Sequence, residues 1–223
     1  MNIEQARFNM IEQQVRPWRV NDAAVLDILE RVPRELFVPA RYEGLAFADT
    51  EIPLDTPEYR SGQVMLAPKL DARMLQALAL HPGETVLEIG TGSGYATALM
   101  AHVTDRISSW EIDPQLARQA ATQLMRAGFD QLDLHTGDGR QALADADARW
   151  DVIVFSGGLA LPPDDFLGRL KPGGRLFCYV GEAPVMEARL YTRQADGNLH
   201  ADDLFETMVP MLRGFPMPNH FRF

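Results

Sequence analysis

The sequence predicts an α/β fold built on a mostly parallel, doubly wound sheet with helices on both faces. Short apolar segments alternate with helical segments from residue 68 onward, which is typical of a parallel sheet covered on both sides. A glycine-rich turn also follows the first apolar segment, as in doubly wound sheets that bind ligands. The strands are expected at 85–89, 106–111, 132–135, 151–156 and 175–180, and the helices between them at 95–102, 114–127 and 163–170.

The first part of the chain is predicted to form a helical extension followed by an irregular stretch. Apolar residues at spacings of three to five predict a helix over 3–14, and Asn21 or Asp22 can cap a second helix that ends before Pro33. The stretch from Pro33 to Pro68 is rich in proline, which disfavours long regular elements. Long irregular segments of compact domains often carry function, so we expect this one to face a substrate.

Local signals also mark the later elements. The helix after the second strand has Asp113 as its N-cap, Pro114 at its first position and Gly128 just beyond its end. Two further strands are expected at 186–193 and 204–211, and they would add an antiparallel pair to the edge of the sheet.

Length, charge and cysteine content narrow the class of protein. The chain has 223 residues and a net charge of −10, so it lacks the basic excess that nucleic-acid or anionic-membrane binding requires. A single cysteine and the absence of closely spaced histidines predict no disulfide and no metal site. We expect one domain over 1–223, with helices and a substrate-facing loop in 1–67 and the α/β core in 68–223. No signal-peptide pattern or membrane-length apolar run is present, so a cytoplasmic location is expected.

The turn after the first predicted strand has the composition of a ligand-binding loop. Gly90, Gly92 and Gly94 let the backbone approach a ligand closely, and the helix that follows offers unpaired N–H groups. A dinucleotide fingerprint needs a small residue where Tyr95 stands, so that class is excluded. The pattern E-x-G-x-G-x-G, which begins at Glu88, resembles the first motif of Rossmann-like methyltransferases that use S-adenosylmethionine.

Two further acids follow the next two predicted strands. Glu111 ends the second strand, where a carboxylate can accept hydrogen bonds from both hydroxyls of a ribose. Asp138 follows the third strand and can receive the amino group of an adenine, while the neighbouring Trp110 either stacks on the adenine or packs in the core. The expected cofactor-binding residues are Glu88, Gly90, Thr91, Gly92, Gly94, Glu111, Ile112, Asp138 and Gly139.

Four segments carry a more specific pattern. They are Arg31-Val-Pro-Arg-Glu-Leu-Phe-Val-Pro39, the glycine loop at 86–95, His135-Thr-Gly-Asp-Gly139 and the stretch 170–176. In this order they resemble the protein-L-isoaspartate O-methyltransferase family from about Met10 to Leu212. The resemblance implies an enzyme that transfers a methyl group from S-adenosylmethionine to a carboxylate of an isoaspartyl residue in a protein or peptide. Such a reaction needs no general base, because a carboxylate is already ionised at pH 7.

The loop at 62–68 departs from the family's pattern. The family's substrate loop is similar to G-Q-T-I-S-Q-P, whose two hydroxyls lie beside the isoaspartyl group. Here Gly62, Gln63 and the final proline remain, but Val64 and Leu66 stand at the two hydroxyl positions. Each unpaired hydrogen bond to a charged group in a dry site costs roughly 2–3 kcal/mol, so the substitutions disfavour a carboxylate substrate. Replacement donors are expected nearby, at Ser61 or Ser156 in particular and otherwise at Tyr59 or Arg60.

Three functions therefore stay open at the level of sequence. The first is isoaspartyl methylation with a modified substrate loop. The second is a protein that binds the cofactor without transferring its methyl group, and the third is methylation of a small apolar acceptor. The sequence does not indicate the oligomeric state.

Overall fold

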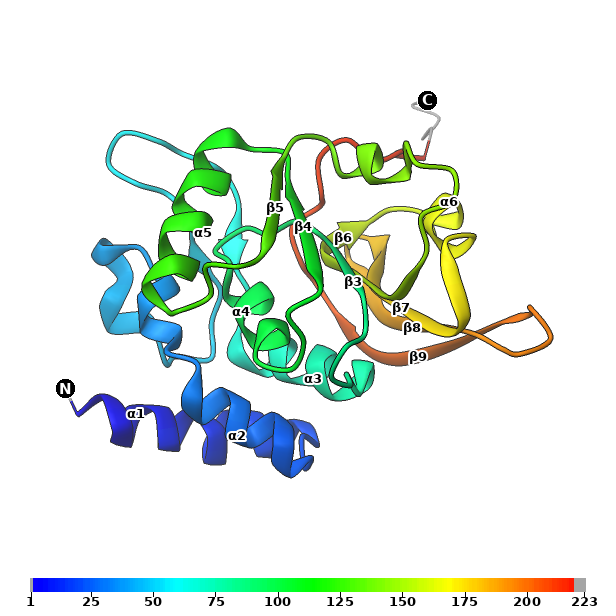
Figure 1. The fold of residues 1–223 in the computed structure, drawn as a ribbon. Coiled ribbons are helices and arrows are strands. Elements are labelled where there is room, and N and C mark those ends of the chain that lie inside the picture. Colours follow the sequence, from blue (N-terminus) through cyan, green and yellow to red (C-terminus); the bar gives the residue numbers. More distant parts are fainter. Residues whose placement is uncertain (1, 219–223) are drawn as a thin grey trace.

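A seven-stranded sheet forms the centre of the protein, which the computed structural model describes over residues 2–218. The strand order is β5-β4-β3-β6-β7-β8-β9, and helices lie on both sides of the sheet (Figure 1). The strands of this sheet are β3 (Val86–Ile89), β4 (Ile107–Glu111), β5 (Asp133–Thr136), β6 (Trp150–Leu159), β7 (Leu170–Glu182), β8 (Val185–Arg193) and β9 (Leu199–Thr207). The α-helices are α1 (Ile3–Met10), α2 (Ala23–Arg31), α3 (Pro68–Leu78), α4 (Tyr95–Ala101), α5 (Pro114–Arg126) and α6 (Asp164–Leu167).

The path of the chain through the sheet creates a switch point at β3. This strand pairs in parallel with both β4 and β6, so the chain adds β4 and β5 on one side and then returns to add β6 and β7 on the other. Ligands of open α/β sheets bind at the carboxyl ends of the strands beside such a point. β8 and β9 follow as antiparallel strands. The predicted fold class is thereby confirmed.

Each face of the sheet has its own apolar core. One core joins the N-terminal helices with α3, α4 and α5, and the other joins α6 with the opposite side of the strands. Every residue of β3 is buried, which explains why this strand lacks an alternating polar pattern. None of the helices within residues 2–218 has the length and apolar character that crossing a bilayer requires.

The N-terminal extension is less regular than the helix predicted over 3–14. After α1 the chain forms a π-helical turn (Ile11–Val15) and a 3₁₀ turn (Arg16–Trp18). Pro17 cannot donate a backbone hydrogen bond, which disfavours continuation of the α-helix. Asp22 caps α2, because its Oδ1 accepts from the backbone N of Ala24 at 2.8 Å.

The proline-rich stretch contains short elements that the sequence pattern does not reveal. Two 3₁₀ turns, Arg34–Phe37 and Ala40–Leu45, precede a small antiparallel hairpin. The hairpin consists of β1 (Ile52–Pro53) and β2 (Val64–Met65), so the predicted substrate loop at 62–68 contains a short strand.

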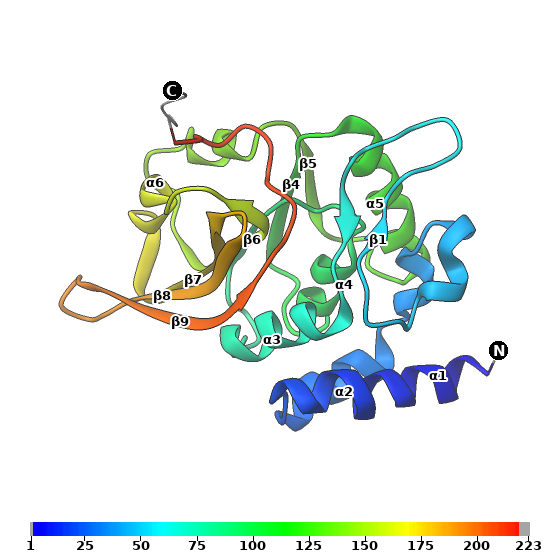
Figure 2. The same cartoon turned by 180° about the vertical axis from the view of Figure 1, so that it is seen from behind.

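Several boundaries predicted from the sequence are wrong, and β7, expected at 175–180, spans Leu170–Glu182. The helix expected at 163–170 is the single turn α6, because β7 already begins at Leu170. The last strand was expected at 204–211 but spans Leu199–Thr207. Its first five residues are exposed and include His200, Asp202 and Asp203, as an edge strand with a solvent-facing side allows. The residues after β9 leave the outer edge of the sheet and run past β6 and β4 (Figure 2).

Candidate active site

The three glycines after β3 adopt the backbone conformation that their sequence pattern predicts. Gly90, Gly92 and Gly94 have φ angles of 96°, 54° and 85°, in the left-handed region that favours glycine. Gly94 is also the N-cap of α4, and a Cβ atom there would lie 3.2 Å from Cγ of Leu124. The loop thus turns sharply at the carboxyl end of β3 and brings α4 close to α5.

Glu111 lies directly against this loop. Its Oε2 accepts from the backbone N of Gly92 at 2.8 Å, and its Oε1 accepts from the backbone N of Asp113 at 2.9 Å. Only 6% of the residue is exposed. Burial raises the pKa of Glu111, and the two backbone donors oppose that rise. The structure therefore brings together two of the predicted groups, the glycine loop and the acid that ends β4.

Glu88 lies beneath the loop and is fully buried. Its carboxylate accepts from three hydroxyls, those of Thr97 at 2.5 Å, Ser109 at 2.7 Å and Ser156 at 2.8 Å. Burial raises the pKa of Glu88, and these three donors oppose the rise. The carboxylate thus ties β3, β4, β6 and α4 together. Thr91 extends this network, because its Oγ1 lies 2.6 Å from Oγ of Ser109.

The predicted adenine end of the site lies beyond β5. Asp138 caps a 3₁₀ turn through the backbone N of Arg140 at 2.9 Å, and it forms an ion pair with the Arg140 guanidinium at 2.6 Å. The hydrogen bond from that guanidinium lowers the pKa of Asp138. A Cβ atom at Gly139 would lie 2.7 Å from Cγ2 of Ile89, so this glycine allows the turn to approach β3. Trp110 stacks on His135, with 4.3 Å between ring centroids.

The C-terminal segment crosses the site, and no sequence pattern indicated this. Leu212 N donates to the carbonyl of Gly158 at 2.8 Å, which fixes the segment beside β6. The Leu212 side chain lies so close to Gly90 that a Cβ atom there would be 2.7 Å from Cδ2. Arg213 then donates to Oδ2 of Asp113 at 2.8 Å. Further on, Phe215 packs against Phe155, and the aromatic residues of 219–223 lie outside the described part of the chain.

Asp113 forms hydrogen bonds with two segments that lie over the site. Besides Arg213 of the C-terminal segment, Tyr59 of the proline-rich stretch donates to Oδ2 of Asp113. Burial raises the pKa of Asp113, but the hydrogen bonds from Tyr59 and Arg213 outweigh this effect and lower the pKa to about 2. The carboxylate is thus ionised at neutral pH and links both segments to the N-terminus of α5.

Two small cavities remain between these walls. The first, called the cofactor cavity after the role that the sequence predicts for its lining, has a volume of 40 Å³ and is bordered by Gly90, Gly92, Glu111, Ile112 and Leu212. The second, called the acceptor cavity after the predicted role of the substrate loop, has a volume of 30 Å³, and Leu66 borders both. A cavity needs about 10–15 Å³ of this kind of volume to hold one water molecule, so the cofactor cavity holds only a few waters and a nucleoside enters it only if the C-terminal segment moves. Asp138, Gly139 and Gly94 border neither cavity.

The substrate loop contributes apolar walls. Val64 and Leu66 line both cavities, and Gln63 lines the cofactor cavity. Ser61 and Gly62 line neither cavity, and their backbone N atoms donate to Oδ1 of Asp55 at 2.9 and 3.4 Å. Of the two leading replacement donors, the structure therefore places Ser156 at the cavities and Ser61 elsewhere.

A buried ion pair underlies the acceptor cavity. Arg34 is 0% exposed and donates to Oδ2 of Asp71 at 3.0 Å and to the carbonyl of Leu66 at 2.6 Å. Burial raises the pKa of Asp71 to about 6, against the opposing charge of Arg34. The acid was missed at the level of sequence, although it interrupts the apolar face of α3 between Leu70 and Met74.

Comparisons with known proteins agree with this geometry. A model of the protein-L-isoaspartate(D-aspartate) O-methyltransferase family matches residues 5–214. A protein-L-isoaspartate O-methyltransferase of Methylorubrum populi is 37% identical over 94% of this chain and 96% of its own length, and one of Koribacter versatilis is 34% identical over 92% and 90%.

A solved structure shows the same fold. It is a protein-L-isoaspartate O-methyltransferase from Plasmodium falciparum in complex with S-adenosyl-L-homocysteine, with a TM-score of 0.77 at 18% identity over 96% of this chain and 99% of that one. By its match over most of its length, the chain described here belongs to the protein-L-isoaspartate(D-aspartate) O-methyltransferase family.

Proposed function

We propose that this chain is a methyltransferase that uses S-adenosylmethionine and esterifies a carboxylate of isoaspartyl residues in proteins or peptides. The observation that carries the proposal is the hydrogen bond from Gly92 N to Glu111 at 2.8 Å, at the switch point of the sheet, with the substrate loop on the opposite wall. Membership of the family supports the reaction.

The residues around the cofactor cavity fit this cofactor once Leu212 is displaced. Glu111 keeps lone pairs for the hydroxyls of a ribose, and Gly90 and Gly92 leave room for a chain of atoms beside their backbone. Ile112 would contact the adenine, and Asp138 would receive its amino group at the end of the cleft. Glu88, which lies beneath the glycine loop, would support the site through its three hydroxyl partners.

The reaction requires the protein mainly to position the substrate and the cofactor. S-adenosylmethionine, when bound, supplies a methyl group on a positively charged sulfur. Transfer of this group to a substrate carboxylate oxygen would break the carbon–sulfur bond, leave its electron pair on sulfur and move no proton. No histidine borders either cavity among the described residues, which is compatible with a reaction that needs no base. The chain must orient one carboxylate oxygen and exclude water.

A second candidate is methylation of a less polar acceptor. Val64 and Leu66 present no hydroxyl, and the carboxylate of Asp71 lines the same cavity. Both features disfavour an anionic acceptor relative to a neutral one.

We also propose a single domain and a cytoplasmic location without nucleic-acid partners. One apolar core contains residues from both 1–67 and 68–218, which supports a single domain. The net charge of −10 disfavours nucleic acid, and the buried, unpaired Cys178 suits a reducing compartment.

The two candidates are separated by methyl transfer to matched peptides. The chain is incubated with radiolabelled S-adenosylmethionine and either an isoaspartyl peptide or the same peptide with ordinary aspartate. Isoaspartyl methylation predicts base-labile labelling of the first peptide alone. Labelling of neither peptide, together with tight binding of S-adenosylhomocysteine in calorimetry, would exclude isoaspartyl methylation and leave the second candidate or a protein that binds the cofactor without transferring its methyl group.

A further inference from the structure

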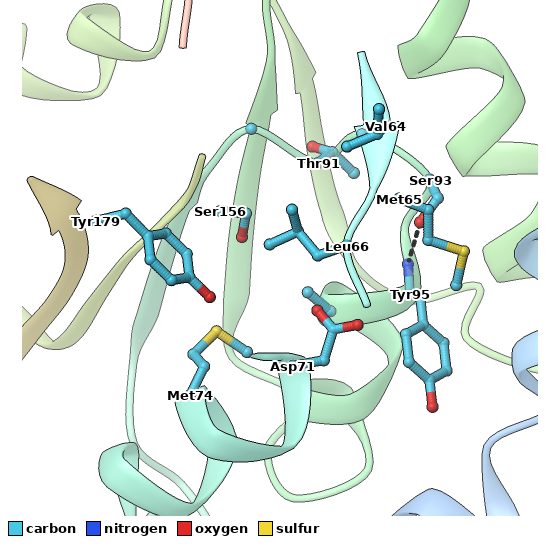
Figure 3. Close-up of a pocket in the computed structure, with 13 residues that line it drawn as sticks. Val64, Met65, Leu66, Asp71, Met74, Thr91, Ser93, Tyr95, Ser156 and Tyr179 are labelled. Atoms are coloured by element: carbon cyan, nitrogen blue, oxygen red, sulfur yellow. Dashed lines mark hydrogen bonds between the residues drawn. The ribbon is translucent and has the colours of Figure 1, made fainter. Parts of the chain in front are cut away.

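One hydroxyl that points into the acceptor cavity has no hydrogen-bond partner in the described part of the chain. Tyr179 lies on β7 and is 1% exposed, and its hydroxyl points toward the middle of the cavity (Figure 3). Among residues 2–218, none forms a hydrogen bond with this hydroxyl. Buried polar groups are nearly always paired, so an unpaired donor that faces a cavity indicates a ligand.

Most other polar groups of this cavity are already engaged, and the Tyr95 hydroxyl, which also lacks a hydrogen-bond partner, points away from the cavity (Figure 3). Ser156 donates to Glu88 at 2.8 Å, so it offers a ligand only lone pairs. Thr91 is paired with Ser109 at 2.6 Å, and Asp71 with Arg34 at 3.0 Å. Ser93 is half-buried and accepts from the backbone N of Tyr95 at 3.2 Å. Tyr179 is therefore the deeply buried donor that remains for an incoming group.

The surroundings of Tyr179 keep it both protonated and fixed. Burial raises its pKa well above the ordinary value, so the phenol retains its proton at neutral pH. Phe177 meets its ring edge to face, with 5.1 Å between centroids, which restricts the ring's orientation. A phenylalanine would fill the same space without the cost of burying an unpaired hydroxyl, so packing alone does not explain a tyrosine here.

We propose that the Tyr179 hydroxyl binds the methyl acceptor and replaces the loop hydroxyls that are missing at Val64 and Leu66. The inference rests on the proposed function. Tyr179 donates to one oxygen of the acceptor carboxylate and leaves the other oxygen free to attack the methyl group. The donor thus comes from the sheet, through β7, rather than from the substrate loop.

The test compares Tyr179→Phe with Tyr191→Phe, a matched loss of one hydroxyl on the neighbouring strand β8. Tyr191 is 8% exposed and packs in the core on the other face of the sheet. For Tyr179→Phe we expect kcat/KM for the isoaspartyl peptide to fall about 10- to 100-fold, as for a lost hydrogen bond to a charged group. Binding of S-adenosylhomocysteine, measured by calorimetry, should stay within about twofold. Tyr191→Phe should change neither quantity.

A rescue variant separates acceptor binding from a structural role. Adding Leu66→Ser to Tyr179→Phe restores a hydroxyl from the loop side of the same cavity, and we expect it to recover part of the lost kcat/KM. Equal kcat/KM for Tyr179→Phe and the unaltered chain would overturn the proposal. So would a loss that Tyr191→Phe shares.

Failure of the proposed function gives a different result. If the unaltered chain does not methylate the isoaspartyl peptide, the comparison is repeated on methyl labelling of a cell extract that depends on the added chain. Loss of this labelling in Tyr179→Phe alone would support Tyr179 as an acceptor-binding residue for another substrate. Undiminished labelling would overturn the assignment, and no labelling by the unaltered chain would overturn both proposals.

Discussion

The buried pair of Arg34 and Asp71 predicts an unusual dependence of stability on pH. Burial raises the pKa of Asp71 to about 6 from an ordinary 3.8. Between these values the folded protein binds more protons than the unfolded chain, so stability falls as pH rises through this window. Each pKa unit corresponds to about 1.4 kcal/mol, and the shift therefore amounts to about 3 kcal/mol. Asp71→Asn removes this dependence and keeps an oxygen that can accept from Arg34.

The assay is urea unfolding of both proteins at intervals from pH 4 to pH 7. We expect the free energy of unfolding of Asp71→Asn, minus that of the unaltered chain, to increase by about 2 kcal/mol from pH 4 to pH 7, since part of the full shift is expressed below pH 4. Asp27→Asn is the matched control, because Asp27 pairs with Arg31 at 2.6 Å on the surface and its pKa is lowered by that hydrogen bond. Its removal should give a slope of the opposite sign. If the free energies of unfolding of Asp71→Asn and of the unaltered chain depend on pH in the same way, the predicted role of Asp71 is wrong.

Three further predictions concern the crevice and the core. Glu111→Gln should weaken binding of S-adenosylhomocysteine at least about 10-fold in calorimetry, since it removes an ionised acceptor; unchanged affinity would exclude Glu111 as the ribose ligand. Leu212→Ala should raise the association rate constant of the same ligand in stopped-flow fluorescence, because its side chain covers Gly90; an unchanged rate would mean that the segment already stands open in solution. Cys178 should resist thiol reagents at pH 8 until the protein unfolds, because burial raises its pKa to about 12; rapid labelling of the folded protein would contradict its burial.

The features that the sequence predicts well are those encoded by neighbouring residues. The alternation of strands and helices, the caps of α5 and the glycine loop each depend on a few consecutive side chains. The approach of Glu111 to Gly92 follows as well, because carboxyl ends of adjacent parallel strands meet at one edge. All of these features could be predicted from the local sequence pattern and the rule for parallel sheets.

Other features depend on contacts between distant parts of the chain. The contact between the Leu212 side chain and Gly90 joins residues that are far apart in the sequence, and no local pattern predicts it. Tyr179 occupies an ordinary position in a buried strand, and only the surrounding cavity shows that its hydroxyl lacks a partner. Glu88 was expected to bind the cofactor. In the structure its carboxylate accepts hydrogen bonds from three hydroxyls on other elements of the fold, which no local pattern predicts.

A crystal structure of the chain with S-adenosylhomocysteine would show whether Glu111 binds the ribose at the glycine loop. We expect both ribose hydroxyls within hydrogen-bond distance of Glu111 and the Leu212 side chain moved away from Gly90. Ligand bound away from the glycine loop, or a ribose that makes no contact with Glu111, would contradict this expectation.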